Sequence, residues 1–125
     1  MDWLEKNRGI SILLAALIAI EIFVFSSFPG NAPGIGGGVK ISIIYHFTVF
    51  FLFGFFFLMS IKGDKEIKIG YIVTTLIISI LYAFLDEFHQ TFVPFRNPSI
   101  QDILTDTAGI FLSTILILYL NKKKF

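Results

Sequence analysis

The chain has 125 residues, of which 55% are hydrophobic and 16 are Phe, and its mean hydropathy is +0.81. These values exceed what the core of a soluble domain needs, and they indicate a membrane protein. The sequence contains no Cys, which excludes a disulfide framework, a cysteine nucleophile and a cysteine-ligated metal or iron–sulfur centre. A formal net charge of +1 is too small to indicate binding of nucleic acid.

Four apolar segments follow one another along the chain, and each is close to the roughly 20 residues that cross a hydrocarbon core. They cover residues 9–28, 41–61, 69–88 and 99–120. Spanning segments must be helical, because lipid cannot satisfy backbone N–H and C=O groups. The sequence therefore predicts an all-α fold, in which residues 1–125 form a single domain, an integral membrane four-helix transmembrane bundle.

The first segment, 9–28, also has features of a cleavable signal peptide, since basic residues precede it and small residues follow its apolar run. Its length and the acidic Glu21 within it favour a retained helix. The Gly/Pro-rich stretch that follows, 29–38, is more typical of a surface connector than of a lid. Its GIGGG is no dinucleotide fingerprint, because no strand precedes it. Neither a nucleotide nor a haem cofactor is expected.

Basic residues are divided unequally between the two ends of the predicted bundle. Eight of the ten lie before the first helix, between the second and third, or after the fourth, whereas Lys40 and Arg96 lie in the other two connections. The three lysine-rich regions fall on one face of a four-span protein, and basic residues mark the cytoplasmic face. We therefore expect a multi-pass protein of the plasma membrane with both termini in the cytoplasm.

Acidic residues are concentrated toward the opposite face. Five acids and one histidine are predicted in the outer half of the bundle: Glu21, His46, Asp86, Glu87, Asp102 and Asp106. Asp86, His89 and Gln90 share one helical face, and Asp102 and Asp106 share another as an i, i+4 pair. Faces this polar should look into the bundle, away from lipid. We expect them to meet the histidine of the second segment in one outer-leaflet pocket.

One continuous stretch carries a recognisable pattern. It is DEFHQTFVPFRNPSIQD, from Asp86 to Asp102, with an acidic pair, His–Gln, Val–Pro, Arg and a downstream Asp. Shorter matches support it: SSFP at 26–29, HF at 46–47 and the acid-x-x-Gly of 106–109. Over nearly its whole length the chain resembles the VanZ-like family of small bacterial and archaeal membrane proteins. It departs from that pattern where Lys, Tyr, Gly and Asn are usual: Ile43, Phe50, Phe95 and Asp106.

The founding member of that family is associated with low-level resistance to the glycopeptide teicoplanin, so the resemblance implies a role in the cell envelope. The first hypothesis is a protein that binds or remodels envelope lipids, with membrane lipids and a lipid-linked envelope precursor as partners. The second is a membrane-embedded enzyme that acts on lipid headgroups by acid/base or metal chemistry. The third is a small ion or solute transporter, for which four helices form a small pathway unless the protein is a homo-oligomer.

The candidate site residues divide by their chemistry. Groups that can exchange protons are the candidate catalytic residues: His46, Asp86, Glu87 and His89. Residues suited to bind a headgroup are their polar neighbours: Glu21, Gln90, Arg96, Asp102 and Asp106. Arg96 would contact phosphate, because its planar fork matches two oxygens. Four residues offer ligand types for a divalent cation: Asp86, His89, Asp102 and Asp106. Their spacing matches no established metal motif.

The same residues also have structural interpretations. Ser99 can cap the fourth helix, with Asp102 at its third position favoured by the helix dipole. The acidic pair can be solvated or paired with Arg96, which would then fix the connecting loop. His46 can serve as a hydrogen-bonding link between helices. These interpretations do not exclude a second, functional role.

Overall fold

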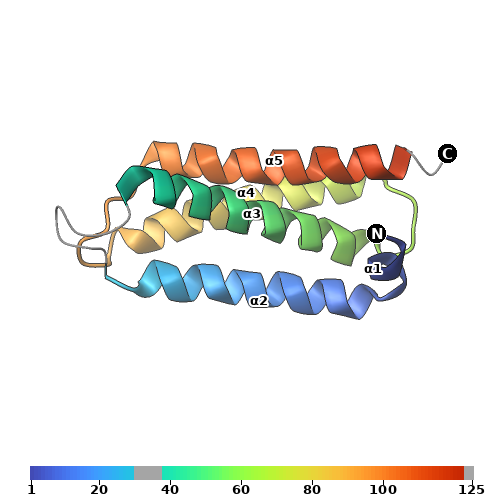
Figure 1. Ribbon diagram of the computed structural model, residues 1–125, viewed down its shortest axis with the longest axis horizontal. Coiled ribbons are helices and arrows are strands. Elements are labelled where there is room, and N and C mark those ends of the chain that lie inside the picture. The colour runs from blue at the N-terminus through green and yellow to red at the C-terminus, as the bar shows by residue number, and fades with distance from the viewer. Residues whose placement is uncertain (30–37, 123–125) are drawn as a thin grey trace.

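The computed structural model describes residues 1–29 and 38–122, which form a bundle of long helices with one short helix at its end (Figure 1). The helices are α1 (Asp2–Lys6), α2 (Arg8–Ser27), α3 (Gly38–Lys62), α4 (Ile69–Gln90) and α5 (Ile100–Lys122). The last four are long and apolar enough to cross a membrane. The predicted all-α architecture is confirmed, and its four long apolar helices are consistent with the four predicted spans. The predicted ends differ from the observed ones by three residues at most.

The long helices alternate in direction, as short connections require (Figure 1). α2 and α4 run toward one end of the bundle, and α3 and α5 run back. The α4–α5 connection, residues 91–99, therefore lies at one end, which we call the pocket end. The opposite end holds α1, the α3–α4 connection and the last turn of α5, and we call it the lysine-rich end.

Two glycines allow α3 and α5 to pack with their backbones in close contact. A Cβ atom on Gly109 of α5 would lie 2.5 Å from the carbonyl oxygen of Phe47, and one on Gly54 of α3 would lie 2.7 Å from Oγ of Ser113. Small residues at such crossings are typical of membrane helices, where close van der Waals packing drives association. Because Phe47 follows His46 directly, this crossing also fixes how near His46 comes to α5.

The interior of the bundle is apolar in two regions. Beneath the pocket end, one buried cluster joins all four long helices: Ile22, Val49, Phe50, Phe53, Ala83 and Ile110. Nearer the lysine-rich end, a second cluster joins α3 and α5: Leu58, Met59 and Ile117. Large apolar side chains on the outside of the bundle stay exposed, among them Ile77, Leu81 and Phe84 of α4. Such a surface suits contact with lipid tails.

At the lysine-rich end, basic side chains hold the short helix against the bundle. Lys62 is only 2% exposed, and its Nζ donates to Oε1 of Glu5 in α1 at 2.8 Å. Nε of Arg8 donates to the carbonyl oxygen of Ser60 at 2.6 Å. Two of the residues behind the charge asymmetry of the sequence therefore also join α1 and α2 to the end of α3.

Candidate functional site

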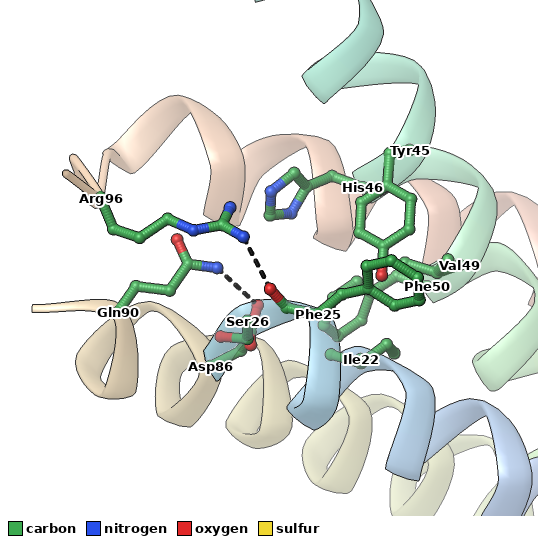
Figure 2. Close-up of a pocket in the computed structure, with 10 residues that line it drawn as sticks. All are labelled: Ile22, Phe25, Ser26, Tyr45, His46, Val49, Phe50, Asp86, Gln90 and Arg96. Atoms are coloured by element: carbon green, nitrogen blue, oxygen red, sulfur yellow. Dashed lines mark hydrogen bonds between the residues drawn. The ribbon is translucent and has the colours of Figure 1, made fainter. Parts of the chain in front are cut away.

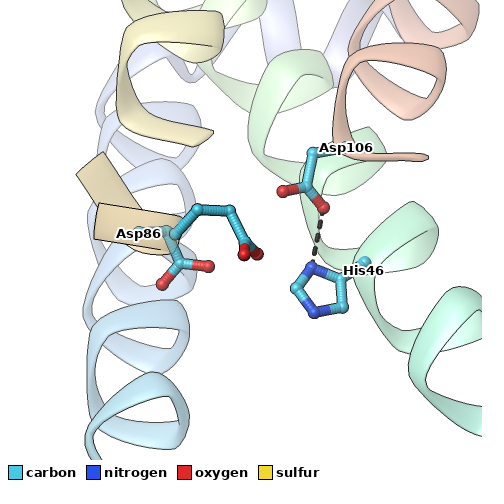
Figure 3. Close-up of side chains that lie close together, drawn as sticks. His46, Asp86 and Asp106 are labelled. Atoms are coloured by element: carbon cyan, nitrogen blue, oxygen red, sulfur yellow. Dashed lines mark hydrogen bonds and ion pairs between the residues drawn. The ribbon is translucent and has the colours of Figure 1, made fainter. Parts of the chain in front are cut away.

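A histidine and an aspartate form the centre of the polar region at the pocket end. Nδ1 of His46 in α3 lies 2.8 Å from Oδ1 of Asp106 in α5, and both residues are buried (Figure 3). Asp102, one turn earlier in α5, places Oδ2 4.0 Å from Nε2 of the same imidazole. The i, i+4 spacing of the two aspartates thus puts both carboxylates beside one ring.

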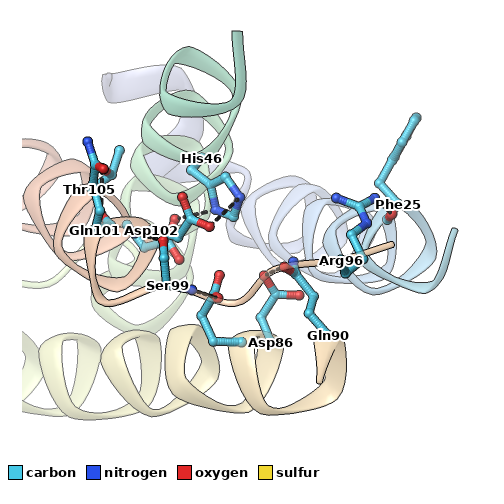
Figure 4. Close-up of polar contacts among 11 residues, drawn as sticks. Phe25, His46, Asp86, Gln90, Arg96, Ser99, Gln101, Asp102 and Thr105 are labelled. Carbon is cyan, nitrogen blue, oxygen red and sulfur yellow. Dashed lines mark hydrogen bonds and ion pairs between the residues drawn. The ribbon is translucent and has the colours of Figure 1, made fainter. Parts of the chain in front are cut away.

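The acidic pair of α4 faces this centre from the other side. Asp86 and Glu87 are 7% and 4% exposed. Oδ2 of Asp86 accepts from the Gln90 amide at 3.4 Å, and Oε2 of Glu87 accepts from the backbone N–H of Ser99 at 3.1 Å (Figure 4). Ser99 in turn caps α5 as predicted, because its Oγ accepts from the N–H of Asp102 at 3.2 Å. Glu87 is therefore anchored where α5 begins.

Four of these residues gather closely enough to act on one ligand. His46, Asp86, Glu87 and Asp106, which we call the His–acid cluster, each offer one ligand atom, and these atoms lie within 4.8 Å of one another. Two carboxylate oxygens in the cluster, Oε1 of Glu87 and Oδ2 of Asp106, are buried without a hydrogen-bond partner. Among residues 1–29 and 41–122, whose side chains the structure describes, no Lys or Arg forms an ion pair with an acid of the cluster.

His89 takes a different position from the one its sequence spacing predicted. Its Nε2 lies 2.9 Å from Oγ of Ser27, and its ring stacks on Phe23 with 5.0 Å between centroids. Successive residues turn by about 100° around a helix, so Glu87 and His89 lie on opposite sides of Asp86. Because α4 lies between α2 and α5, Glu87 reaches α5 while His89 reaches α2. The imidazole of the cluster is therefore that of His46 in α3 and not that of His89.

A small pocket opens beside the cluster, between α2, α3 and α4 (Figure 2). Its wall is apolar on one side and polar on the other: Ile22, Phe25, Ser26, Tyr45, His46, Val49, Phe50, Asp86, Gln90 and Arg96. The cavity volume is about 20 Å³, and one water molecule needs roughly 10–15 Å³. Glu21 is half-buried on α2 and lies outside both this lining and the cluster.

Arg96 closes one side of the pocket by bonding to the end of α2. Its Nη2 donates to the carbonyl of Phe25 at 2.6 Å and its Nε donates to that of Phe28 at 3.0 Å (Figure 4). The last carbonyls of a helix lack partners within the helix, and they carry partial negative charge. Arg96 therefore fixes the α4–α5 connection, as one interpretation of the sequence expected, but through backbone oxygens and without an acidic partner.

Sequence reasoning missed part of the pocket wall. Tyr45 and Val49 were not singled out, and Phe50 was noted only as a departure from the family pattern, because aromatic and aliphatic residues in an apolar segment serve equally well as lipid-facing bulk. The sequence holds a weak signal for Tyr45, which directly precedes the candidate His46 and adds a hydroxyl to a largely apolar segment. Its hydroxyl is buried without a hydrogen-bond partner.

Four apolar helices around a buried His/Asp/Glu cluster define a small multi-pass membrane protein with a polar site inside its bundle. Comparison with known families then identifies the group: a family model described as VanZ/LLP1 matches residues 10–121, and the chain belongs to this family. The resemblance expected from the sequence is confirmed. Comparisons with curated proteins and with solved structures gave no match.

Proposed function

We propose that this VanZ/LLP1-family protein binds or remodels the polar headgroup of an envelope lipid in the outer leaflet. The observation that carries this proposal is the mixed wall of the pocket. Phe25, Val49 and Phe50 stand on one side, with Asp86 and Arg96 on the other. A lipid is amphipathic in the same way, because its tail needs apolar contact where its headgroup needs charge and hydrogen bonds.

The outward orientation is part of the proposal, and the distribution of basic residues supports it. In the sequence, eight of the ten lie before α2 or at its first residue, in or beside the α3–α4 connection, or from Lys122 onward. Basic residues near the ends of spans favour the cytoplasmic side. The lysine-rich end, and with it both termini, would then be cytoplasmic, and the pocket would open to the outer leaflet.

The small pocket volume determines how binding would proceed. A cavity of about 20 Å³ holds a water molecule and not a headgroup. Entry therefore requires the α4–α5 connection to move, and Arg96 is the residue that restrains it. A phosphate would replace the carbonyls of Phe25 and Phe28 as the partner of the guanidinium, since bonds between two charged groups are the stronger ones. The acids would engage an amine, sugar or cation of the same ligand.

Native mass spectrometry of protein extracted in mild detergent tests the proposal. The unaltered chain should retain a lipid, and Arg96→Ala and Asp86→Asn should lose most of it. Lys65→Ala is the matched control, because it removes an exposed positive charge at the lysine-rich end, and it should retain the lipid. Thermal unfolding of each variant shows whether the fold survives. A lipid retained equally by folded Arg96→Ala and Asp86→Asn would contradict binding at this pocket.

A second candidate, an enzyme acting on the same headgroup, is favoured by the His46–Asp106 pair. An imidazole held by a carboxylate at 2.8 Å has the geometry of a general base with its orienting group. Incubation with the retained lipid would separate the two candidates, because only an enzyme releases a changed headgroup. Transport, the third hypothesis, has less support, since buried Leu58, Met59 and Ile117 fill the bundle toward the lysine-rich end.

The resistance implied by the family resemblance would follow if the bound lipid were a lipid-linked envelope precursor. Holding or altering such a precursor changes how much of it an external glycopeptide can reach. Expression of the chain in a susceptible bacterium should then raise the teicoplanin concentration that stops growth. Arg96→Ala expressed to the same level should not, and an equal rise would separate resistance from the pocket.

A further inference from the structure

We infer that the His–acid cluster is a binding site for one divalent transition-metal ion of the Mn²⁺ class. Its members come from three different helices: His46 from α3, Asp86 and Glu87 from α4, and Asp106 from α5 (Figure 3). The inference goes beyond lipid recognition and does not depend on it. It rests on the spacing of the ligand atoms, on two unpaired buried oxygens and on the charges around them.

The spacing of the ligand atoms is close to that of a coordination shell. All four atoms lie within 4.8 Å of one another. A metal bound at roughly 2.0–2.2 Å places ligands on opposite sides about 4.0–4.4 Å apart. The most widely separated of these atoms therefore need to approach by only about 0.4–0.8 Å, a change within the reach of side-chain rotation alone. A single ion would contact α3, α4 and α5 together.

The hydrogen bonding of the cluster leaves oxygens free to face an ion. Glu87 uses Oε2 for the N–H of Ser99, and its Oε1 is buried without a partner. Asp106 uses Oδ1 for His46, and its Oδ2 is also buried without a partner. Buried polar atoms are nearly always satisfied, so two orphan oxygens in one cluster require an explanation. A bound cation provides one for both.

The charges in the cluster also favour a cation. Three carboxylates lie beside one imidazole, and Asp102 adds a fourth at 4.0 Å from Nε2 of His46. Arg96, the basic residue of the pocket wall, is bonded to carbonyl oxygens. Like charges this close repel strongly where water is scarce. A divalent ion would offset this repulsion without any rearrangement of the helices.

The donor set selects among divalent ions. Ca²⁺ prefers six to eight oxygens and Mg²⁺ keeps several of its waters, whereas the adjoining cavity has room for about one water. Mixed imidazole and carboxylate ligands suit Mn²⁺, Fe²⁺ and Zn²⁺. The surrounding bonds would orient the ligands, because Ser99 holds Glu87 and Gln90 holds Asp86. The neighbouring cavity would supply one open coordination position.

Mn²⁺ titration followed by electron paramagnetic resonance tests the inference, because binding removes the six-line signal of the free ion. Detergent-solubilised protein, stripped with a chelator, should take up one Mn²⁺ per chain. Glu87→Gln and Asp106→Asn, which keep the size of each side chain, should weaken binding by at least about tenfold. Asp64→Asn, which changes an exposed acid at the lysine-rich end, should leave binding unchanged.

A thermal melt of the same samples guards against a folding artefact. Mn²⁺ should raise the unfolding temperature of the unaltered chain and of Asp64→Asn, because a ligand stabilises the state that binds it. Asp86→Asn provides a third cluster variant if either of the others fails to fold. The inference is overturned if the unaltered chain takes up no Mn²⁺ at millimolar concentration, or if folded cluster variants bind it as tightly as Asp64→Asn does. Neither result depends on whether a lipid is retained.

Discussion

Phe95 occupies a backbone conformation that suits glycine. Its φ is +60°, the only positive value at a non-glycine residue in the part of the chain that the structure describes. A Cβ in the left-handed region costs roughly 1–2 kcal/mol, and glycine is the residue usual at this position in the family the sequence resembles. The side chain is 67% exposed, so little packing offsets that cost. The strain lies next to Arg96, which holds the connection against α2.

Phe95→Gly should therefore raise the free energy of unfolding, by about 1 kcal/mol after the added flexibility of the unfolded chain is counted. Thermal unfolding in detergent measures it. Phe92→Gly is the matched control, because Phe92 is an exposed aromatic in the same connection with a negative φ. Phe92→Gly should not raise the free energy of unfolding. A lower unfolding temperature for Phe95→Gly would mean that the aromatic ring contributes more than the strained backbone removes.

At the level of single residues, sequence reasoning located the polar residues but not all of their contacts. The cap of Ser99 on α5 followed from local spacing, since its partner Asp102 is three residues away. The position of His89 could not be predicted in this way. Sequence spacing shows which residues share a face of a helix, but it does not show which other helix packs against that face. Glu87 and His89 are two residues apart and reach different helices.

Among the helices, the α3–α5 crossing positions the candidate site. Gly109 lies three residues after Asp106 in α5, and Phe47 follows His46 in α3, so the closest backbone contact adjoins the His46–Asp106 hydrogen bond. Any side chain at Gly109 would push against the carbonyl of Phe47, which cannot turn aside as a flexible side chain would. Separation of the two helices would then lengthen the bond.

Gly109→Ala should lower the free energy of unfolding by about 1–3 kcal/mol, the usual cost of overpacking. Alanine is more favourable than glycine inside a helix by up to about 1 kcal/mol, which offsets part of the steric cost. The measured loss of unfolding free energy is therefore a lower bound on the steric cost at Gly109. Gly70→Ala is the control, because a Cβ there meets nothing within 4 Å. It should leave stability unchanged or raise it slightly. If both variants unfold at the same temperature, the α3–α5 contact is looser than the structure indicates.

The four long helices were predictable because apolar length and bounding charges suffice to define a span. The short α1 was not, since five residues are too few to show periodicity, and it is held by contacts with α2 and α3 such as Glu5 with Lys62. The sequence predicted that the aspartates of α5 meet His46 of α3, but the close backbone crossing of the two helices was beyond it. Gly109 was noticed as part of a motif, but its contact with Phe47 requires the three-dimensional arrangement.

For the whole molecule, the direction of insertion decides which leaflet the pocket meets. Figure 1 places the α4–α5 connection and the α3–α4 connection at opposite ends of the bundle. Asn97 is exposed in the first and Asp64 is exposed in the second. The chain contains no Cys, so one introduced cysteine reports on one position without a background. Neither Asn97→Cys nor Asp64→Cys alters the basic residues that direct insertion.

In intact cells, a maleimide that cannot cross the membrane should label Asn97→Cys and should label Asp64→Cys only after permeabilisation. The reason is the excess of basic residues at the lysine-rich end, a distribution that favours the cytoplasmic side. Labelling of both after permeabilisation shows that each cysteine is reactive. The reverse pattern would place the His–acid cluster in the inner leaflet. The protein would then have to bind an envelope lipid in the inner leaflet, before that lipid is transferred outward. The inferred cation site depends only on contacts inside the bundle and would be unaffected.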